Sequence, residues 1–182
     1  MKNVVVFAAN ECSKEKEAYY YSQARETGRL LAKNGFTTVT GGGPGLMDEV
    51  MHGAFAAGGK TIAICLDFPG RKQTEYATEK LVYKDLTARQ TKLISLGDAF
   101  LSLPGGLGTF YEISAVLAHK RKLEIDPEIP FILIDGYFRE YQSLIDKMVK
   151  EGFTDAKVYE FFKHAQSPQD AIRFLKKNLN EH

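Results

Sequence analysis

Residues 36–57 read FTTVTGGGPGLMDEVMHGAFAA and contain three successive patterns. The β-branched run at residues 36–40 favours a strand. The glycine cluster at residues 41–45 predicts a turn. The spacing of apolar residues over 46–57 then predicts a helix. A strand, a glycine turn and a helix in immediate succession form the unit from which parallel α/β sheets are built.

The same alternation continues along the chain in both directions. Further strands are expected at residues 4–8, 61–66, 80–83, 99–103, 130–134 and 161–165, and further helices at 14–34, 86–96, 109–123 and 137–150. Residues 67–77 are expected to form a loop. Gly35 is placed to end the first helix, and Ser167 to cap a last helix that begins with Pro168. We therefore expect one domain over residues 1–182, with an α/β, Rossmann-like doubly wound fold. Its sheet would be mostly parallel, with about six or seven strands and helices on both faces.

Composition narrows the functional class. The chain has 182 residues, 44% of them hydrophobic, and its 24 basic and 23 acidic residues give a net charge of +1. This balance argues against a nucleic-acid binder, which normally carries a basic excess. No apolar run approaches the roughly 18 residues of a membrane span, so no membrane association is expected. With only two cysteines, a disulfide framework is not expected, and we predict a cytoplasmic protein.

Two glycine-rich loops follow expected strands. Residues 40–47 read TGGGPGLM, and residues 104–109 read PGGLGT. Glycines let backbone amides approach a ligand, and the helix that follows adds a partial positive charge that favours phosphate. Leu46 stands where a dinucleotide fingerprint needs its third glycine, so that motif is absent. One loop alone is compatible with a plain tight turn. Two loops at the carboxyl ends of strands in one sheet predict a cleft for an anionic or nucleotide ligand.

Two charged residues are candidates for a catalytic or binding role in that cleft. Glu112 follows Thr109 by three residues, a spacing that is typical of a capping box at a helix N-terminus. The alternative is a carboxylate directed into the cleft, where it would stabilise positive charge on a sugar carbon. Arg89 lies in the expected helix at residues 86–96. It is either a surface residue or a guanidinium that reaches the same cleft and pairs with phosphate.

These motifs together resemble the LONELY GUY family, whose members are often labelled "possible lysine decarboxylase". The family pattern is a strand followed by G-G-G-x-x-G-L-M, then a helix that carries an arginine, then P-G-G-x-G-T-x-x-E. Here the first loop is Gly41-Gly42-Gly43-Pro44-Gly45-Leu46-Met47, one residue shorter than that pattern. The second motif, PGGLGTFYE from Pro104 to Glu112, is complete, and Arg89 falls in the intervening helix.

The resemblance implies a phosphoribohydrolase. Such an enzyme cuts the N-glycosidic bond of a purine nucleoside 5′-monophosphate, such as AMP or a cytokinin riboside monophosphate, into the free base and ribose 5-phosphate. It implies that Glu112 stabilises an oxocarbenium-like C1′ and that Arg89 offsets negative charge and positions the ligand. The resemblance also implies a homodimer, and the implied reaction requires no metal or organic cofactor. No lysine in the sequence is marked out for a Schiff base with pyridoxal phosphate. The residues it assigns to substrate and phosphate binding are Gly42, Gly43, Met47, Gly105, Gly106, Leu107, Gly108, Thr109 and Asn10.

Departures from the family pattern leave other readings open. Asn10 stands where relatives carry a serine, and Gln90 replaces the lysine that usually follows the arginine. One alternative is a carrier of the same fold that binds a nucleotide-like or pterin cofactor without turning it over. The presence of both Glu112 and Arg89 favours the enzyme. A second alternative is suggested by the segment at residues 58–63, which is similar to the Rossmann-like domain of DNA-processing proteins. The near-neutral charge weighs against it.

Overall fold

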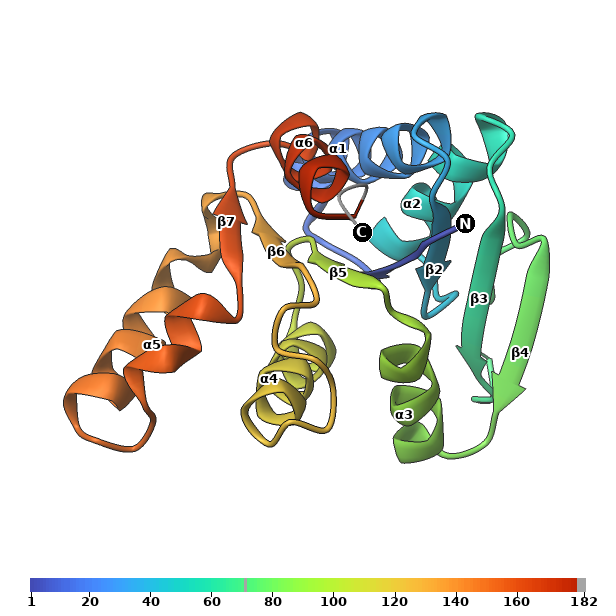
Figure 1. The fold of residues 1–182 in the computed structure, drawn as a ribbon. Helices are drawn as coiled ribbons and strands as arrows, with labels where there is room; N and C mark the ends of the chain where they lie inside the picture. Colours follow the sequence, from blue (N-terminus) through green and yellow to red (C-terminus); the bar gives the residue numbers. More distant parts are fainter. Residues whose placement is uncertain (71, 180–182) are drawn as a thin grey trace.

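The computed structural model describes residues 1–70 and 72–179, and its centre is a seven-stranded sheet in which every neighbouring pair is parallel. The strand order is β4-β3-β2-β1-β5-β6-β7 (Figure 1). The strands are β1 (Asn3–Phe7), β2 (Thr37–Thr40), β3 (Thr61–Leu66), β4 (Glu79–Tyr83), β5 (Ala99–Ser102), β6 (Phe131–Ile134) and β7 (Lys163–Ala165). The helices are α1 (Lys14–Lys33), α2 (Leu46–Ala56), α3 (Leu86–Leu96), α4 (Leu107–Arg121), α5 (Arg139–Lys150) and α6 (Pro168–Leu179). Two 3₁₀ turns occupy Gly136–Phe138 and Ala156–Glu160.

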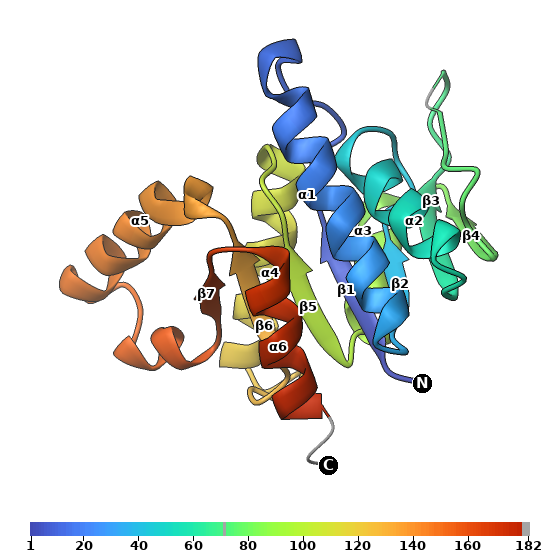
Figure 2. The same ribbon diagram turned by 90° about the horizontal axis from the view of Figure 1, so that it is seen from above.

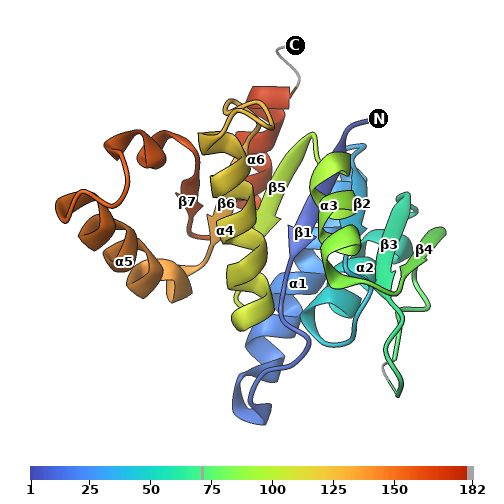
Figure 3. The same cartoon turned by 90° about the horizontal axis from the view of Figure 1, so that it is seen from below.

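Helices cover both faces of the sheet. Helices α1, α2 and α6 lie on one face, as the view from above shows (Figure 2), and α3 and α4 lie on the other, as seen from below (Figure 3). Alternate residues of β1 take part in separate cores: Val4 and Val6 pack with α1 and α2, whereas Val5 and Phe7 pack with α3 and α4. The expected doubly wound α/β fold is therefore confirmed, and the central strands are buried on both sides because helices cover both.

Most expected elements form close to their expected bounds, and the exceptions have local causes. The helix expected at residues 109–123 begins two residues earlier, at Leu107, directly after the Gly105-Gly106 pair. The helix expected at residues 137–150 opens as a 3₁₀ turn, in which Asp135 accepts a hydrogen bond from the Tyr137 amide, and α5 itself begins at Arg139.

The expected helix ends are confirmed. Gly35 has a φ of +76° directly after the last turn of α1, a conformation that suits glycine. At the start of α6, the Ser167 hydroxyl accepts a hydrogen bond from the Asp170 amide (3.2 Å) and donates one to the Asp170 carboxylate (2.8 Å). The expected N-cap at Ser167 is therefore present.

A loop replaces the crossover helix between β3 and β4. The predicted loop at residues 67–77 is confirmed for the described part; residue 71 lies outside the described residues. The loop crosses the α2 face, where the ring of Tyr76 stacks on His52 at 4.4 Å between centroids. The Thr74 amide donates to the Gly42 carbonyl (2.9 Å), and the Lys80 ammonium donates to the Thr74 carbonyl (2.9 Å). These contacts fix the loop beside the first glycine loop.

Helices α1 and α2 touch backbone to backbone through two glycines. A Cβ placed on Gly28 of α1 would lie 1.9 Å from the Val50 carbonyl oxygen of α2. A Cβ on Gly53 of α2 would lie 1.9 Å from the Arg25 carbonyl oxygen of α1. Both distances are far below any real contact, so the packing of these helices requires glycine at both positions.

A buried lysine joins α4 to the two segments that lead into β6 and β7. The Lys120 side chain is 1% exposed. Its ammonium donates hydrogen bonds to the carbonyls of Pro127 (3.0 Å), Ile129 (2.5 Å) and Phe161 (2.8 Å). Each of the three N–H groups of the ammonium thus has a carbonyl acceptor. Burial lowers the pKa of Lys120 to about 8.

Within residues 1–70 and 72–179, no helix combines the length and the apolar character that crossing a lipid bilayer requires.

We predict that Gly28→Ala destabilises the fold. An exposed glycine-to-alanine change in a helix stabilises it by up to about 1 kcal/mol. Here the added methyl group overlaps the Val50 carbonyl, so we expect a loss of about 1–3 kcal/mol in the free energy of unfolding. Urea unfolding of the wild-type protein and the variant measures this difference in the free energy of unfolding. Gly136→Ala, whose Cβ would meet nothing closer than 3.4 Å, is the control. A Gly28→Ala protein as stable as the wild type would contradict the packing.

We also predict a pH dependence from Lys120. The pKa of the Lys120 ammonium is near 10.4 in the unfolded chain and about 8 in the folded chain. Between these values the unfolded state binds more protons, so this residue raises the free energy of unfolding as pH rises, by up to about 3 kcal/mol. The difference in unfolding free energy between wild type and Lys120→Met, measured from pH 7 to 10, should therefore increase. A difference in unfolding free energy that does not change with pH would contradict the lowered pKa of Lys120.

Candidate active site

A cleft of about 460 Å³ opens where the strand order reverses between β1 and β5. In doubly wound sheets this reversal leaves a crevice outside the carboxyl ends of the strands. Here the residues after β1, the first turn of α2, the end of β3, the start of α3 and the first turns of α4 all line the cleft. Segments far apart in the sequence therefore meet at one edge of the sheet.

The N-terminus of α4 lines one side of the cleft. Gly106 is the N-cap residue and has no side chain to accept from the amides of the first turn, and Gly106, Leu107, Gly108 and Thr109 all line the cleft. Such a helix end offers backbone donors and a partial positive charge to an anion. The phenol of Tyr137 donates to the Gly105 carbonyl (2.7 Å) and supports the loop from behind.

The capping-box alternative for Thr109 and Glu112 is wrong. Because α4 begins at Leu107, Thr109 is its third residue and Glu112 its sixth, beyond the first turn. Thr109 is buried against Gly105, where an added Cβ would lie 2.1 Å from the threonine hydroxyl. Glu112 lines the cleft instead. The residue pair has capping-box spacing, but the glycines before it let the helix start earlier than that motif requires.

Arg89 reaches the cleft from α3 and is held on several sides. The helix is capped by Asp85, whose carboxylate accepts from the Ala88 amide (2.7 Å). The Arg89 guanidinium donates through Nε to the Ile64 carbonyl (2.7 Å), and its Nη1 lies 3.7 Å from Oε1 of Glu112. A Cβ on Gly41 would stand 1.8 Å from Nη2 of Arg89. The first glycine loop thus leaves room for the guanidinium.

The ion pair between Arg89 and Glu112 is largely shielded from water. Each side chain is 10% exposed. At such sites charges interact more strongly than at the surface, because less water screens them. The cleft therefore has a fixed positive and a fixed negative group side by side.

The first glycine loop does not offer its helix N-terminus to the cleft. The amides of Leu46 and Met47, which begin α2, both donate to the Ala9 carbonyl (3.0 and 3.4 Å). Gly45, with a φ of +72°, permits this approach, because a Cβ there would lie 2.0 Å from the Asn10 carbonyl oxygen. Gly42 and Gly43 border a separate, much smaller hollow beside Arg89. The loop thus uses the first two amides of α2 to hold the end of β1, and its glycines lie beside Arg89 rather than in the cleft.

The structure brings most of the predicted site residues into one cleft. Glu112, Arg89, Met47, Asn10, Gly106, Leu107, Gly108 and Thr109 line it together. Gly42, Gly43 and Gly105 do not line it, and Gly105 instead borders an adjoining cavity with Cys12. Burial and nearby Glu17 raise the pKa of the Cys12 thiol, which disfavours the reactive thiolate.

Sequence reasoning missed the apolar side of the cleft. Leu66, Phe68 and Leu86 line it, as does Glu11. Leu66 ends β3 and Phe68 follows it, so the rule that ligands bind at the carboxyl ends of parallel strands would have pointed to both. Leu86 begins α3 and carried no comparable signal.

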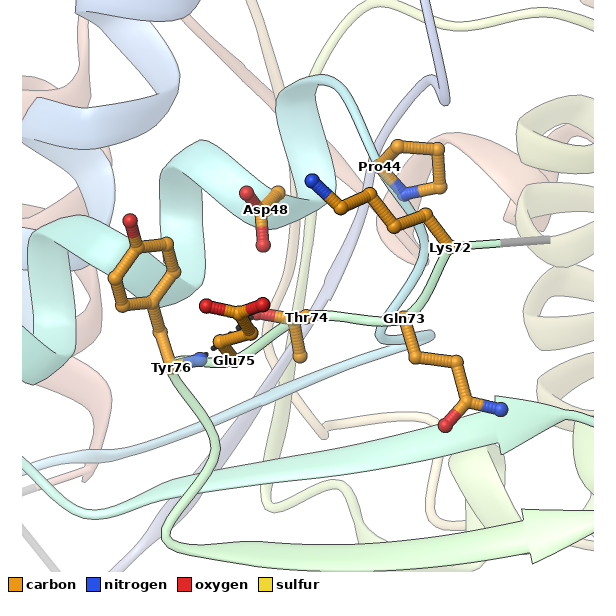
Figure 4. Close-up of a pocket in the computed structure, with 7 residues that line it drawn as sticks. All are labelled: Pro44, Asp48, Lys72, Gln73, Thr74, Glu75 and Tyr76. Carbon is orange, nitrogen blue, oxygen red and sulfur yellow. Dashed lines mark hydrogen bonds between the residues drawn. The ribbon is translucent and has the colours of Figure 1, made fainter.

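A second hollow, of about 90 Å³, lies between α2 and the loop after β3. Figure 4 shows Lys72 extending over it toward the first turn of α2, where Asp48 lies, with Glu75 and Tyr76 on the loop side. Neither Arg89 nor Glu112 borders this hollow. Among residues 1–70 and 72–179 there is no group of three or more His, Cys, Asp or Glu side chains that could hold a metal ion.

Comparison with known proteins agrees with this fold. The family model described as "Possible lysine decarboxylase" matches residues 47–175. The cytokinin riboside 5′-monophosphate phosphoribohydrolase LOG3 of Arabidopsis thaliana is 28% identical over 177 residues, which cover 96% of this chain and 81% of that protein.

Two solved structures share the fold. The crystal structure of TM1055 has a TM-score of 0.77 at 24% identity and covers 97% of this chain and 99% of its own. The molybdenum cofactor carrier protein of Chlamydomonas reinhardtii has a TM-score of 0.74 at 23% identity, with 98% of both chains covered. The family match spans most of the chain and includes Arg89 and the whole PGGLGTFYE motif, so the chain belongs to the "possible lysine decarboxylase", or LONELY GUY, family.

Proposed function

We propose that the protein hydrolyses the N-glycosidic bond of a purine nucleoside 5′-monophosphate and releases the free base and ribose 5-phosphate. The observation that carries this proposal is the shielded ion pair of Arg89 and Glu112 in the same cleft as the N-terminus of α4. Relatives such as LOG3 are named for this reaction on cytokinin riboside monophosphates.

The 5′-phosphate would bind at the N-terminus of α4. The first amides of this helix face the cleft, and the glycines at 106 and 108 leave the approach open, because a Cβ at either position would meet nothing within 4 Å. Asn10, beyond the end of β1, lines the same part of the cleft and can donate through its amide. The site would thus hold the phosphate mainly by backbone donors.

The ribose would then lie over the ion pair. As the bond between C1′ and the base nitrogen breaks, its electron pair leaves with the base and positive charge develops at C1′. The Glu112 carboxylate stabilises that charge, and a water oxygen forms the new bond to C1′. One water proton is transferred to the departing base, and the hydroxyl stays on the sugar. Arg89 keeps the Glu112 carboxylate in place and offsets the negative charge that phosphate and carboxylate bring together.

The decarboxylase chemistry in the family description does not fit this cleft. Pyridoxal phosphate enzymes hold the cofactor through a Schiff base to a lysine. Of the described residues that line the cleft, none is a lysine. The buried Lys120 is committed to three backbone carbonyls elsewhere on α4. The proposed reaction therefore does not involve this cofactor.

A homodimer and a cytoplasmic location stay predictions. Helix α4, near which the family resemblance suggests the dimer contact, borders an apolar groove of about 320 Å³ together with α5. Leu144, Met148 and Phe153 line this groove and are exposed. Sedimentation of the purified protein measures the oligomeric state directly.

We predict that Glu112→Gln abolishes base release. The substitution keeps the shape of the side chain and removes the charge that stabilises C1′, so we expect kcat to fall by about a hundredfold or more. The measurement is release of free base and ribose 5-phosphate from AMP, other nucleoside 5′-monophosphates and the matching nucleosides. The same substitution at Glu124, an exposed glutamate after α4, is the matched control and should leave the rate unchanged.

The outcomes of this assay separate an enzyme from a carrier. Release from monophosphates but not from nucleosides, lost in Glu112→Gln, supports the hydrolase. Binding of the monophosphates without release by the wild-type protein would contradict the hydrolase and favour a carrier.

We further predict that Gly106→Ala and Gly108→Ala weaken phosphate binding but not the fold. The added methyl groups have open space around them in the ligand-free protein, so thermal stability should not fall. The methyl groups would project where a phosphate approaches the amides, and we expect ribose 5-phosphate to bind about tenfold more weakly. Calorimetric titration measures the affinity and thermal unfolding the stability. Unchanged affinity for ribose 5-phosphate in both variants would show that the phosphate does not bind at the N-terminus of α4.

A further inference from the structure

The cleft has two chemically different ends. At one end are the first turn of α4, with its exposed Leu107, and the polar side chains of Asn10 and Glu11 after β1. At the other end Leu66, Phe68 and Leu86 line the wall. The sheet places these ends apart: the order β3-β2-β1-β5 puts the end of β3 three strands from the end of β5. At the usual strand spacing that is about 14 Å.

The ion pair lies between the two ends. Arg89 reaches from α3 to the Ile64 carbonyl in β3, and Glu112 projects from the second turn of α4. A ligand that has its phosphate on α4 and its sugar over the ion pair therefore extends its base toward the end of β3. This orientation rests on the proposed function.

Phe68 is left exposed at the place where the base would arrive. Its side chain is 61% exposed and lines the cleft. A large apolar group at a concave surface marks a contact site more often than a single exposed residue elsewhere does. Leu86, on the neighbouring start of α3, is likewise exposed. These side chains carry no charge, so this end suits the flat, weakly polar face of a nucleobase.

The backbone around Phe68 is constrained. The Asp67 amide, one residue before, donates to the Tyr83 carbonyl of β4 (2.7 Å). Pro69 follows and restricts the backbone of Phe68 to extended conformations. Further along, the hydrogen bond from the Thr74 amide to the Gly42 carbonyl ties the loop to the first glycine loop. The chain just before Phe68 is therefore anchored to the edge strand of the sheet, which places the ring beside the cleft.

We propose that Phe68 is the base-stacking residue of the cleft and that, with Leu66 and Leu86, it gives the site its preference for purines over pyrimidines. The larger ring system of a purine covers more of this apolar wall. Stacking of an aromatic side chain on a base is sensitive to ring area and tolerant of base identity. AMP and GMP should therefore bind with similar affinity, and CMP and UMP more weakly.

The test compares ligands that differ only in the base. Calorimetric titrations of AMP, CMP and ribose 5-phosphate are made with Glu112→Gln protein, to prevent turnover, and with Glu112→Gln/Phe68→Ala protein. We expect the alanine variant to bind AMP about tenfold or more weakly, since base stacking contributes on this scale. Ribose 5-phosphate has no base, so its affinity should not change. Phe68→Trp should restore AMP binding, and Phe153→Ala, an exposed phenylalanine outside the cleft, should change neither affinity.

The results distinguish failure of this proposal from failure of the proposed hydrolysis. Equal effects of Phe68→Ala on AMP and ribose 5-phosphate, or no effect on either, would overturn the stacking role even if the wild-type protein hydrolyses AMP. A selective loss of AMP affinity supports the stacking role even if no hydrolysis occurs. If AMP does not bind to protein with an intact Phe68, both proposals fall.

Discussion

The site depends on the accommodation of one guanidinium, that of Arg89, at the carboxyl ends of the buried strands. A cation in such a place must be hydrogen-bonded and paired. The Ile64 carbonyl and the Glu112 carboxylate supply these interactions, and Gly41 supplies the space. Three elements that are distant in sequence, the end of β3, the loop after β2 and the second turn of α4, are thus fixed around one side chain. The cleft takes its shape from this arrangement.

The two glycine loops have different structural roles, although their sequences are similar. After β2, Gly45 brings α2 so close to the β1 end that its first amides are used by the Ala9 carbonyl. After β5, Gly106 caps α4 without a side chain, and the residues of the first turn of that helix line the cleft. A helix N-terminus attracts an anion only where its donors are accessible. The second loop therefore carries the proposed anion site, and the first loop makes room for Arg89 and holds α2 against the end of β1.

The sequence was sufficient for the sheet and for the second loop because both depend on local patterns: alternating apolar runs, and glycines at a strand end. It predicted Arg89 and Glu112 but not the contact between them, because that contact depends on where Gly106 starts α4 and on how α3 packs. The position of Phe68 in the cleft was missed because a single aromatic residue in a polar loop has no periodic signal, and only its place just after β3 pointed to it. The close approach of α2 to Gly28, where a Cβ would overlap the Val50 carbonyl, is likewise a tertiary contact that helical spacing does not reveal.

The fold alone does not separate an enzyme from a carrier, since a molybdenum cofactor carrier protein shares it at a TM-score of 0.74. The ion pair is more informative. Burying two charges carries a desolvation cost that their attraction repays only in part, and apolar residues of similar size often stabilise a protein as well or better. A carrier needs donors for its ligand but does not need a shielded carboxylate beside them. The proposed hydrolysis, which develops positive charge at a sugar carbon, does need that carboxylate, and the ion pair with Arg89 keeps it in the cleft.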